Sequence, residues 1–193
     1  MKRNIKKLLI VNSGKGGNFK RIFPLLRSKG NFQIFVIIYN SESLNKFCVK
    51  NNIETFYIKK TSRQKLDKLL FKYASLIKPN VTLLFYNYII KKNFLDKFKF
   101  VFNLHYTLLP KFKGLDGFEK SLKSKHSEIG CTLHIAEEKF DEGKIIIQKK
   151  IKNLSKESLN IKKQKIFLLG IRILKLFFSD LDYYLKKTEN LKN

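Results

Sequence analysis

Short apolar segments alternate with amphipathic segments along the first hundred residues of the chain. The apolar segments carry hydrophobic side chains at successive positions, which is typical of strands buried on both faces. They cover residues 7–12, 32–39, 54–58, 81–86 and 99–103. Strands of this kind that alternate with helices predict a parallel sheet with helices on both faces. The expected fold class is therefore α/β, with a doubly wound, mostly parallel Rossmann-like sheet.

The segments between these strands have hydrophobic residues at helical spacing. The first predicted helix carries Phe19, Ile22, Phe23 and Leu26 and ends at Gly30. Ser41 can cap a second helix, and Thr61 or Ser62 can cap a third one that ends before Pro79. Each predicted strand is thus followed by a helix or a turn, as βαβ units require.

After Asn103 the pattern changes. A loop from 105 to 117 precedes a short helix over 118–125 and two strand-like segments, 129–136 and 144–151, which an acidic turn joins. One C-terminal helix is expected to begin near Ser155 or Ser158. We expect one domain over residues 1–193, with a core at 5–150 and a C-terminal helical extension at 151–193.

The chain is strongly basic, with 41 Lys and Arg against 15 Asp and Glu and a net charge of +26. A polyanion partner is one interpretation of this charge. The basic residues are mostly lysines scattered over every segment, however, so a general lysine bias explains them better than a binding patch. We expect small-molecule substrates, no specific nucleic acid, and a positive field that helps to attract a phosphorylated substrate.

The two cysteines, Cys48 and Cys131, have no metal-ligand spacing, and no metal is expected. They are predicted to be reduced in a cytoplasmic protein. No apolar stretch approaches the ~20 residues of a membrane span, and the basic start has too short an apolar run for a signal peptide. The protein is expected to be a monomer or a homodimer that does not bind a membrane.

A glycine-rich segment, Ser13-Gly14-Lys15-Gly16-Gly17-Asn18, joins the first strand to the first helix. Backbone amides at a helix start can bind an anion, and the helix dipole favours this. The segment lacks the spacing of a Walker A loop and the third glycine of a dinucleotide fingerprint. It is either a tight turn or a phosphate site without a nucleotide.

Three residues with suitable chemistry lie at predicted strand–loop junctions: Asn103, His105 and Asp141. An amide and an imidazole can stabilise a developing oxyanion, and a carboxylate can accept or relay a proton. These are the requirements of acyl transfer to an amine without a covalent enzyme intermediate. His134 is predicted to be a buried structural histidine, and Cys131, in an apolar strand beside this candidate site, is a less favoured nucleophile.

Five linked motifs make the chain resemble the folate-dependent formyltransferase family, and within it the phosphoribosylglycinamide formyltransferase branch. The motifs are Asn103-Leu104-His105, Thr107-Leu108-Leu109-Pro110, Gly130-Cys131-Thr132-Leu133-His134, Asp141-Glu142-Gly143 and Ile145-Ile146-Ile147-Gln148. The glycine-rich segment at 13–18 and Ser62-Arg63 also match that branch. The likeness covers roughly residues 5 to 150.

The resemblance implies a role for each of these residues. Asn103, His105 and Asp141 would be catalytic. Gly16, Gly17, Asn18 and Arg63 would bind the substrate phosphate, and Asn87, Tyr88 and Ile89 would line the pocket for the folate and the substrate. The formyl donor would be 10-formyltetrahydrofolate, used as a co-substrate, and the amine of glycinamide ribonucleotide would be the acceptor.

The chain departs from the family where the acceptor is expected to bind. Phe85-Tyr86-Asn87-Tyr88 lacks the family's arginine and glycine, and Lys163-Gln164 stands where the family has a Glu-His pair. Lys144 stands where the family has a proline, and Tyr106 stands where the family has a proline or a histidine. Two alternatives therefore stay open: an N-formyltransferase for the amino sugar of a nucleotide-linked sugar, and a basic nucleic-acid-binding module that is not an enzyme.

Overall fold

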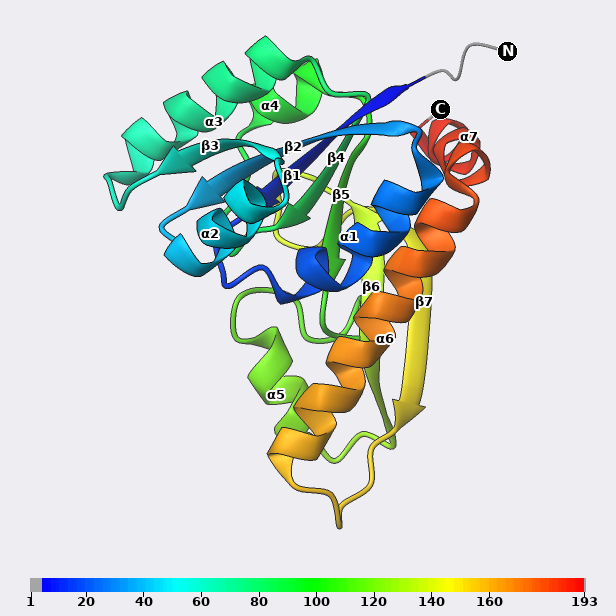
Figure 1. Ribbon diagram of the computed structural model, residues 1–193. Helices are drawn as coiled ribbons and strands as arrows, with labels where there is room; N and C mark the ends of the chain where they lie inside the picture. Colours follow the sequence, from blue (N-terminus) through cyan, green and yellow to red (C-terminus); the bar gives the residue numbers. More distant parts are fainter. Residues whose placement is uncertain (1–4, 193) are drawn as a thin grey trace. The chain divides into compact units, whose positions relative to one another are not determined.

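The computed structural model describes residues 5–192 and has an α/β fold (Figure 1). Seven strands form a sheet in the order β3-β2-β1-β4-β5-β6-β7. The strands are β1 (Lys6–Asn12), β2 (Phe32–Tyr39), β3 (Glu54–Ile58), β4 (Val81–Phe85), β5 (Val101–His105), β6 (Glu128–Ile135) and β7 (Ile145–Lys152). The helices are α1 (Gly17–Lys29), α2 (Glu42–Lys50), α3 (Arg63–Ile77), α4 (Lys92–Lys97), α5 (Gly117–Lys123), α6 (Leu159–Ser179) and α7 (Leu181–Lys192). The predicted fold class, a mostly parallel sheet in an α/β protein, is confirmed.

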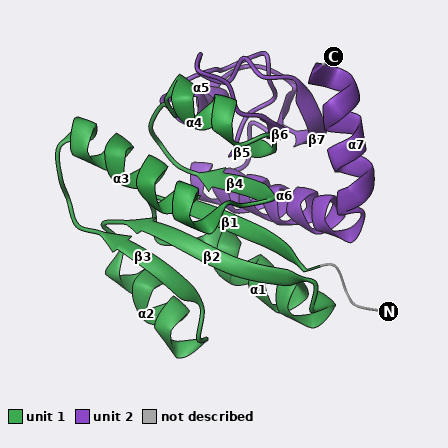
Figure 2. Cartoon of the chain, turned by 90° about the horizontal axis from the view of Figure 1, so that it is seen from above, with its two compact units in different colours: residues 1–102 green, residues 103–193 purple. Residues whose placement is uncertain are grey.

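The chain divides into two compact units, Met1–Phe102 and Asn103–Asn193, which we call unit 1 and unit 2 (Figure 2). The boundary lies inside β5 and not near residue 150. The extent of a single domain over 1–193 stays a prediction.

Unit 1 is built from parallel βα repeats. β1 pairs in parallel with β2 and with β4, and β2 pairs in parallel with β3. Figure 2 shows α1 and α2 on one face of these strands and α3 on the other. Residues 8–11 of β1 have no exposed surface, because helices cover both faces of this strand.

Unit 2 contains the antiparallel pair of β6 and β7, with Thr132 opposite Gln148 in the register. The C-terminal segment forms two helices and not the single one that the sequence predicted. α6 ends at Ser179, the backbone leaves the helical conformation at Asp180, and α7 begins directly afterwards.

Side-chain caps confirm two of the predicted helix starts. The hydroxyl of Ser62 accepts a hydrogen bond from the amide of Lys65, and the hydroxyl of Ser158 accepts one from the amide of Ile161, both at 3.4 Å. Ser41 occupies the predicted cap position of α2, but its side chain makes no capping bond.

Candidate active site

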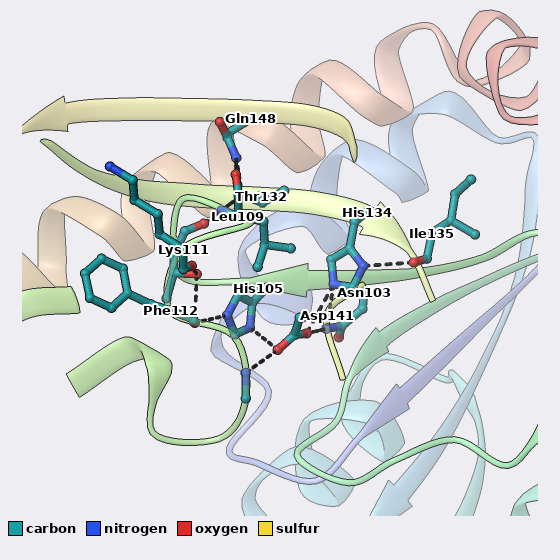
Figure 3. A network of polar contacts seen from close by, with 12 residues as sticks. Asn103, His105, Leu109, Lys111, Phe112, Thr132, His134, Ile135, Asp141 and Gln148 are labelled. Carbon is teal, nitrogen blue, oxygen red and sulfur yellow. Dashed lines mark hydrogen bonds and ion pairs between the residues drawn. The ribbon is translucent and has the colours of Figure 1, made fainter. Parts of the chain in front are cut away.

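The structure brings Asn103, His105 and Asp141 together in unit 2 (Figure 3). Asn103 and His105 are two residues apart on β5, so their side chains leave the same face of the strand. Asp141 comes from the loop between β6 and β7 and has a left-handed backbone conformation, with φ of 53°. Its Oδ1 lies 3.4 Å from Asn103 Nδ2, and its Oδ2 lies 3.4 Å from His105 Nδ1. The three side chains therefore form one connected polar cluster.

His134 belongs to the same cluster, which the sequence did not reveal. It is buried, as expected for its position in β6, and its Nδ1 lies 2.8 Å from the carbonyl oxygen of Ile135. A carbonyl only accepts, so Nδ1 carries a proton, and in the tautomer with a single N–H the Nε2 atom is an acceptor. Nε2 lies 3.2 Å from Asn103 Nδ2 and 3.4 Å from Oδ1 of Asp141. The amide nitrogen of Asn103 thus donates to His134, and this fixes which way the amide faces.

Asp141 is nearly enclosed, since its side chain is 7% exposed. Burial alone would raise the pKa of this carboxyl, but contacts with His134, His105 and the Gly114 amide outweigh it and lower the pKa. The Gly114 amide donates to Oδ2 at 2.9 Å. Asp141 is therefore a carboxylate at neutral pH, and its negative charge lies beside Nδ1 of the His105 imidazole.

The pKa of His105 is lowered from its usual value, first of all because the imidazole is buried. The carboxylate of Asp141 and a hydrogen bond to the carbonyl of Phe112 oppose this shift. His105 is thus a neutral imidazole at pH 7 that can still donate one proton. Burial raises the pKa of the fully buried Cys131 thiol, so this residue is a poor candidate for a nucleophile.

The glycine-rich segment forms the turn between β1 and α1 in unit 1. Gly16 has φ of 74°, and a Cβ added there would lie 2.5 Å from Cδ1 of Leu44, so glycine is required for local structure. It is the N-cap of α1 and has no side chain that could bond the first helical amides. Gly14 is different, because a Cβ added there would meet nothing within 4 Å and its φ is not left-handed. A structural reason for glycine thus exists at Gly16 but not at Gly14.

The predicted pocket segment lies against this turn. The amide of Asn87 donates to the hydroxyl of Ser13 at 3.1 Å, and the amide of Ser13 donates to the carbonyl of Phe85 at 3.1 Å. These bonds link the segment after β4 to the glycine-rich segment within unit 1.

Arg63, at the start of α3, meets the same segment. Its guanidinium carbon lies 5.2 Å from the centre of the Tyr88 ring, and its NH2 group donates to the carbonyl of Ile89. Its Nε forms an ion pair with Asp67 at 3.0 Å. The side chain of Arg63 is 37% exposed, so it can still meet a ligand, although Asp67 neutralises part of its charge.

Tyr88 is the centre of an aromatic cluster that the sequence analysis missed. Its ring centroid lies 5.8 Å from that of Tyr39 and 5.1 Å from that of Tyr86. These tyrosines fill the place where the sequence lacks the family's glycine and arginine. The sequence shows two of these tyrosines, one on either side of Asn87. The third, Tyr39, lies at the end of another strand, so the sequence alone does not indicate that it joins the cluster.

The expected acceptor end contains a charge pair in unit 2. Lys163 of α6 lies 2.6 Å from a carboxylate oxygen of Glu119 of α5, and both side chains are at least 40% exposed. A basic residue thus stands at the family's acidic position, and an acidic residue from α5 neutralises it.

Among residues 5–192, no cluster of His, Cys, Asp and Glu side chains is arranged to hold a metal ion. None of the described helices is long and apolar enough to cross a membrane.

Comparisons with known proteins agree with this fold. The chain is 29% identical over 155 residues to the trifunctional purine biosynthetic protein adenosine-3 of Chironomus tentans, which covers 74% of this chain. It is 25% identical over 164 residues to the phosphoribosylglycinamide formyltransferase of Haemophilus influenzae, covering 80% of this chain and 77% of that one. The crystal structure of the phosphoribosylglycinamide formyltransferase of Campylobacter jejuni superimposes with a TM-score of 0.80 at 26% identity, covering 92% of this chain and 97% of the other.

Some relatives are much longer than this chain. It spans 11% of the trifunctional protein and 25% of the methionyl-tRNA formyltransferase of Endomicrobium trichonymphae, with which it shares 36% identity over 80 residues. Residues 6–174 match the formyl transferase family, a stretch that includes Asn103, His105, His134 and Asp141. The chain therefore belongs to the formyl transferase family.

Proposed function

We propose that the protein is an enzyme that transfers the formyl group of 10-formyltetrahydrofolate to the amine of glycinamide ribonucleotide, a step of purine biosynthesis. The observation that carries the proposal is the cluster of Asn103, His105 and Asp141, which lies inside the segment that matches the family. The near full-length likeness to a phosphoribosylglycinamide formyltransferase supports the choice of acceptor.

The residues of the cluster suit this reaction. As the acceptor amine attacks the formyl carbon, negative charge develops on the formyl oxygen, and Asn103 and His105 would donate hydrogen bonds to it. Such a donor is worth on the order of 3 kcal/mol in the transition state. The contact from Asn103 Nδ2 to Asp141 is long, at 3.4 Å, so this second amide hydrogen is only weakly bonded, and a formyl oxygen placed beside it would share it without any turn of the amide. The tetrahedral intermediate would then break the bond between the formyl carbon and the folate nitrogen. Asp141 would hold the imidazole and relay, through water, the proton that the amine loses to this leaving nitrogen.

The substrate phosphate would bind to the amides of Gly16, Gly17 and Asn18 at the start of α1, where the helix dipole favours an anion. Arg63 would add positive charge next to Tyr88 and Ile89. Asn87, Tyr88 and Ile89 would line the pocket beside this phosphate site, since Asn87 is bonded to the same turn.

One observation favours a second acceptor, the amino sugar of a nucleotide-linked sugar. The Lys163–Glu119 pair changes the end of the site that meets the amine in the resemblance described above. A different amine would account for this change.

The acceptor can be decided by one experiment. The purified protein is given 10-formyltetrahydrofolate with glycinamide ribonucleotide, with an amino-sugar nucleotide or with methionyl-tRNA, and consumption of the donor is followed. We expect turnover with glycinamide ribonucleotide alone. Turnover with either of the other acceptors, and none with glycinamide ribonucleotide, would refute the proposal.

A further inference from the structure

We propose that Thr107 is a positioning residue whose hydroxyl holds the main-chain carbonyl of Phe112 against Nε2 of His105 and so keeps a proton on that nitrogen. This inference rests on the proposed role of His105 in formyl transfer. All of the residues involved lie in unit 2, and Figure 3 shows the contact of His105 with the main chain at Phe112.

The carbonyl oxygen of Phe112 is the meeting point of the two side chains. His105 Nε2 lies 3.1 Å from it, and the hydroxyl of Thr107 donates to it at 3.3 Å, sharing its hydrogen with the carbonyl of Lys111 at 3.2 Å. Thr107 has no exposed surface, so water does not compete for its hydroxyl. The loop after β5 thus folds back and offers a carbonyl to the histidine at the end of β5.

The position of this carbonyl is restricted from other sides as well. Phe112 has a left-handed backbone, with φ of 57°. A Cβ added to Gly117 would lie 1.9 Å from the Phe112 oxygen, so only glycine fits at the start of α5. The contact between His105 and Phe112 is therefore part of a closely packed arrangement and not a passing approach of a mobile loop.

Thr107 is itself anchored to β6 and β7. The hydroxyl of Thr132 donates to the carbonyl of Thr107 at 2.7 Å. The side-chain amide of Gln148 donates to the Thr132 hydroxyl at 2.9 Å and to the carbonyl of Leu109 at 2.9 Å. This chain of bonds runs from Gln148 through Thr132 and Thr107 to Phe112, and it gives a function to two motif residues that the catalytic cluster does not use.

The arrangement decides which nitrogen of His105 is protonated. A neutral imidazole has one N–H, but His105 faces an acceptor at each nitrogen: the Phe112 carbonyl at Nε2 and the Asp141 carboxylate at Nδ1. The Phe112 contact is shorter, at 3.1 Å against 3.4 Å, and it favours the proton on Nε2. In the free protein the Phe112 carbonyl accepts this Nε2–H, and a formyl oxygen bound beside that carbonyl would share it.

Few other ionisable groups near His105 affect which of its two nitrogens carries the proton. The ring of His134 lies 6.4 Å away between centroids, and its own proton is held by Ile135. In the two flanking loops, Lys113 and Glu142 form an ion pair with each other at 3.3 Å. The competition is therefore between Asp141 and Phe112.

The test is nitrogen NMR of the imidazole rings in the full-length protein at pH 8, where His105 is neutral. The chain has three histidines, and the His105→Asn variant identifies the signals of His105. We expect the wild type to show a protonated Nε2 and Thr107→Val to shift the proton toward Nδ1. Thr107→Ser, which keeps the hydroxyl, should restore the wild-type spectrum. Gly117→Ala, which pushes the Phe112 carbonyl away, should act like Thr107→Val.

A matched control is Thr82→Val on β4. Thr82 is also fully buried, and within the part of the chain that the structure describes its hydroxyl has no hydrogen-bond partner, so the His105 spectrum should not change. Thr107→Val should also lower kcat about tenfold, the effect of one ordinary hydrogen bond, and leave KM for the folate unchanged. A His105 spectrum that is the same in wild type, Thr107→Val and Gly117→Ala would overturn the inference. A shifted proton with unchanged kcat would support the positioning of His105 and would count instead against His105 as the donor in the proposed function.

Discussion

The amide nitrogen of Asn103 lies 3.2 Å from Nε2 of His134, whose other nitrogen is held by the carbonyl of Ile135 at 2.8 Å. His134 therefore does more than fill the core beneath the candidate site. It decides which atom of the Asn103 amide faces Asp141, and this orientation is the one that lets Asn103 act as a hydrogen-bond donor.

Two substitutions of His134 separate its two contacts. His134→Asn keeps a donor near Nδ1 for the Ile135 carbonyl but loses the acceptor at Nε2, whereas His134→Gln keeps an acceptor near Nε2. We expect kcat to fall about tenfold in His134→Asn and much less in His134→Gln, because only the first removes the acceptor at position 134 and leaves the Asn103 amide with the longer contact to Asp141 alone. Both variants should lower the free energy of unfolding, by about 1–3 kcal/mol, since each leaves a buried polar group unsatisfied. Steady-state kinetics and denaturant titration measure the two effects, and equal kcat values in the two variants would contradict this role of His134.

The acceptor phosphate should contribute to binding through the glycine-rich segment. Calorimetry with glycinamide ribonucleotide and with its dephosphorylated form should show weaker binding of the second, and the difference should shrink as salt screens the charges. Gly16→Ala should reduce this difference and cost about 1–3 kcal/mol of stability, because φ at residue 16 is 74° and Leu44 occupies the space of the new methyl group.

Gly14→Ala is the matched control for that variant, since the added methyl group meets nothing within 4 Å. Its free energy of unfolding should stay within about 0.5 kcal/mol of the wild type. If both forms of the acceptor bind equally well to the wild type, the segment is only a turn, and the phosphate has no site there.

The lowered pKa of His105 should appear in the pH dependence of stability. The folded protein binds this proton less readily than the unfolded chain, whose histidines titrate near 6.5. The stabilisation is therefore present above about pH 6.5 and is lost as the pH falls toward the folded-state pKa. We expect the free energy of unfolding of the wild type to drop over this window, and we expect a smaller drop in His105→Asn. Parallel curves for the two proteins in denaturant titrations would show that His105 is not perturbed by folding.

The sequence was enough to predict the α/β fold and to single out Asn103, His105 and Asp141, which the structure brings into contact, while their catalytic role stays a prediction. Unbroken apolar runs such as residues 8–11 predict strands buried on both faces, and the structure confirms this. Strand edges were less accurate: the strand predicted for 99–103 is β5, Val101–His105, so His105 ends the strand and does not follow it.

Tertiary contacts explain what the sequence could not provide. The role of His134 depends on the β6–β7 loop folding back over β5, which no local pattern encodes. Gly16 is fixed by Leu44, a residue of the next helix, and Tyr88 meets Tyr39 from the end of another strand. The break at Asp180 between α6 and α7 was missed because hydrophobic residues continue at helical spacing through it.

The central claim is that His105 takes part in formyl transfer, and one measurement tests it most directly. The rate of formyl transfer from 10-formyltetrahydrofolate to glycinamide ribonucleotide is compared between the wild type and His105→Ala, with the unfolding free energy of both measured in the same buffer. We predict a fall in kcat of about 100-fold, the usual cost of removing one donor to an oxyanion, with stability changed by about 1 kcal/mol or less. Wild-type turnover in His105→Ala would contradict the account.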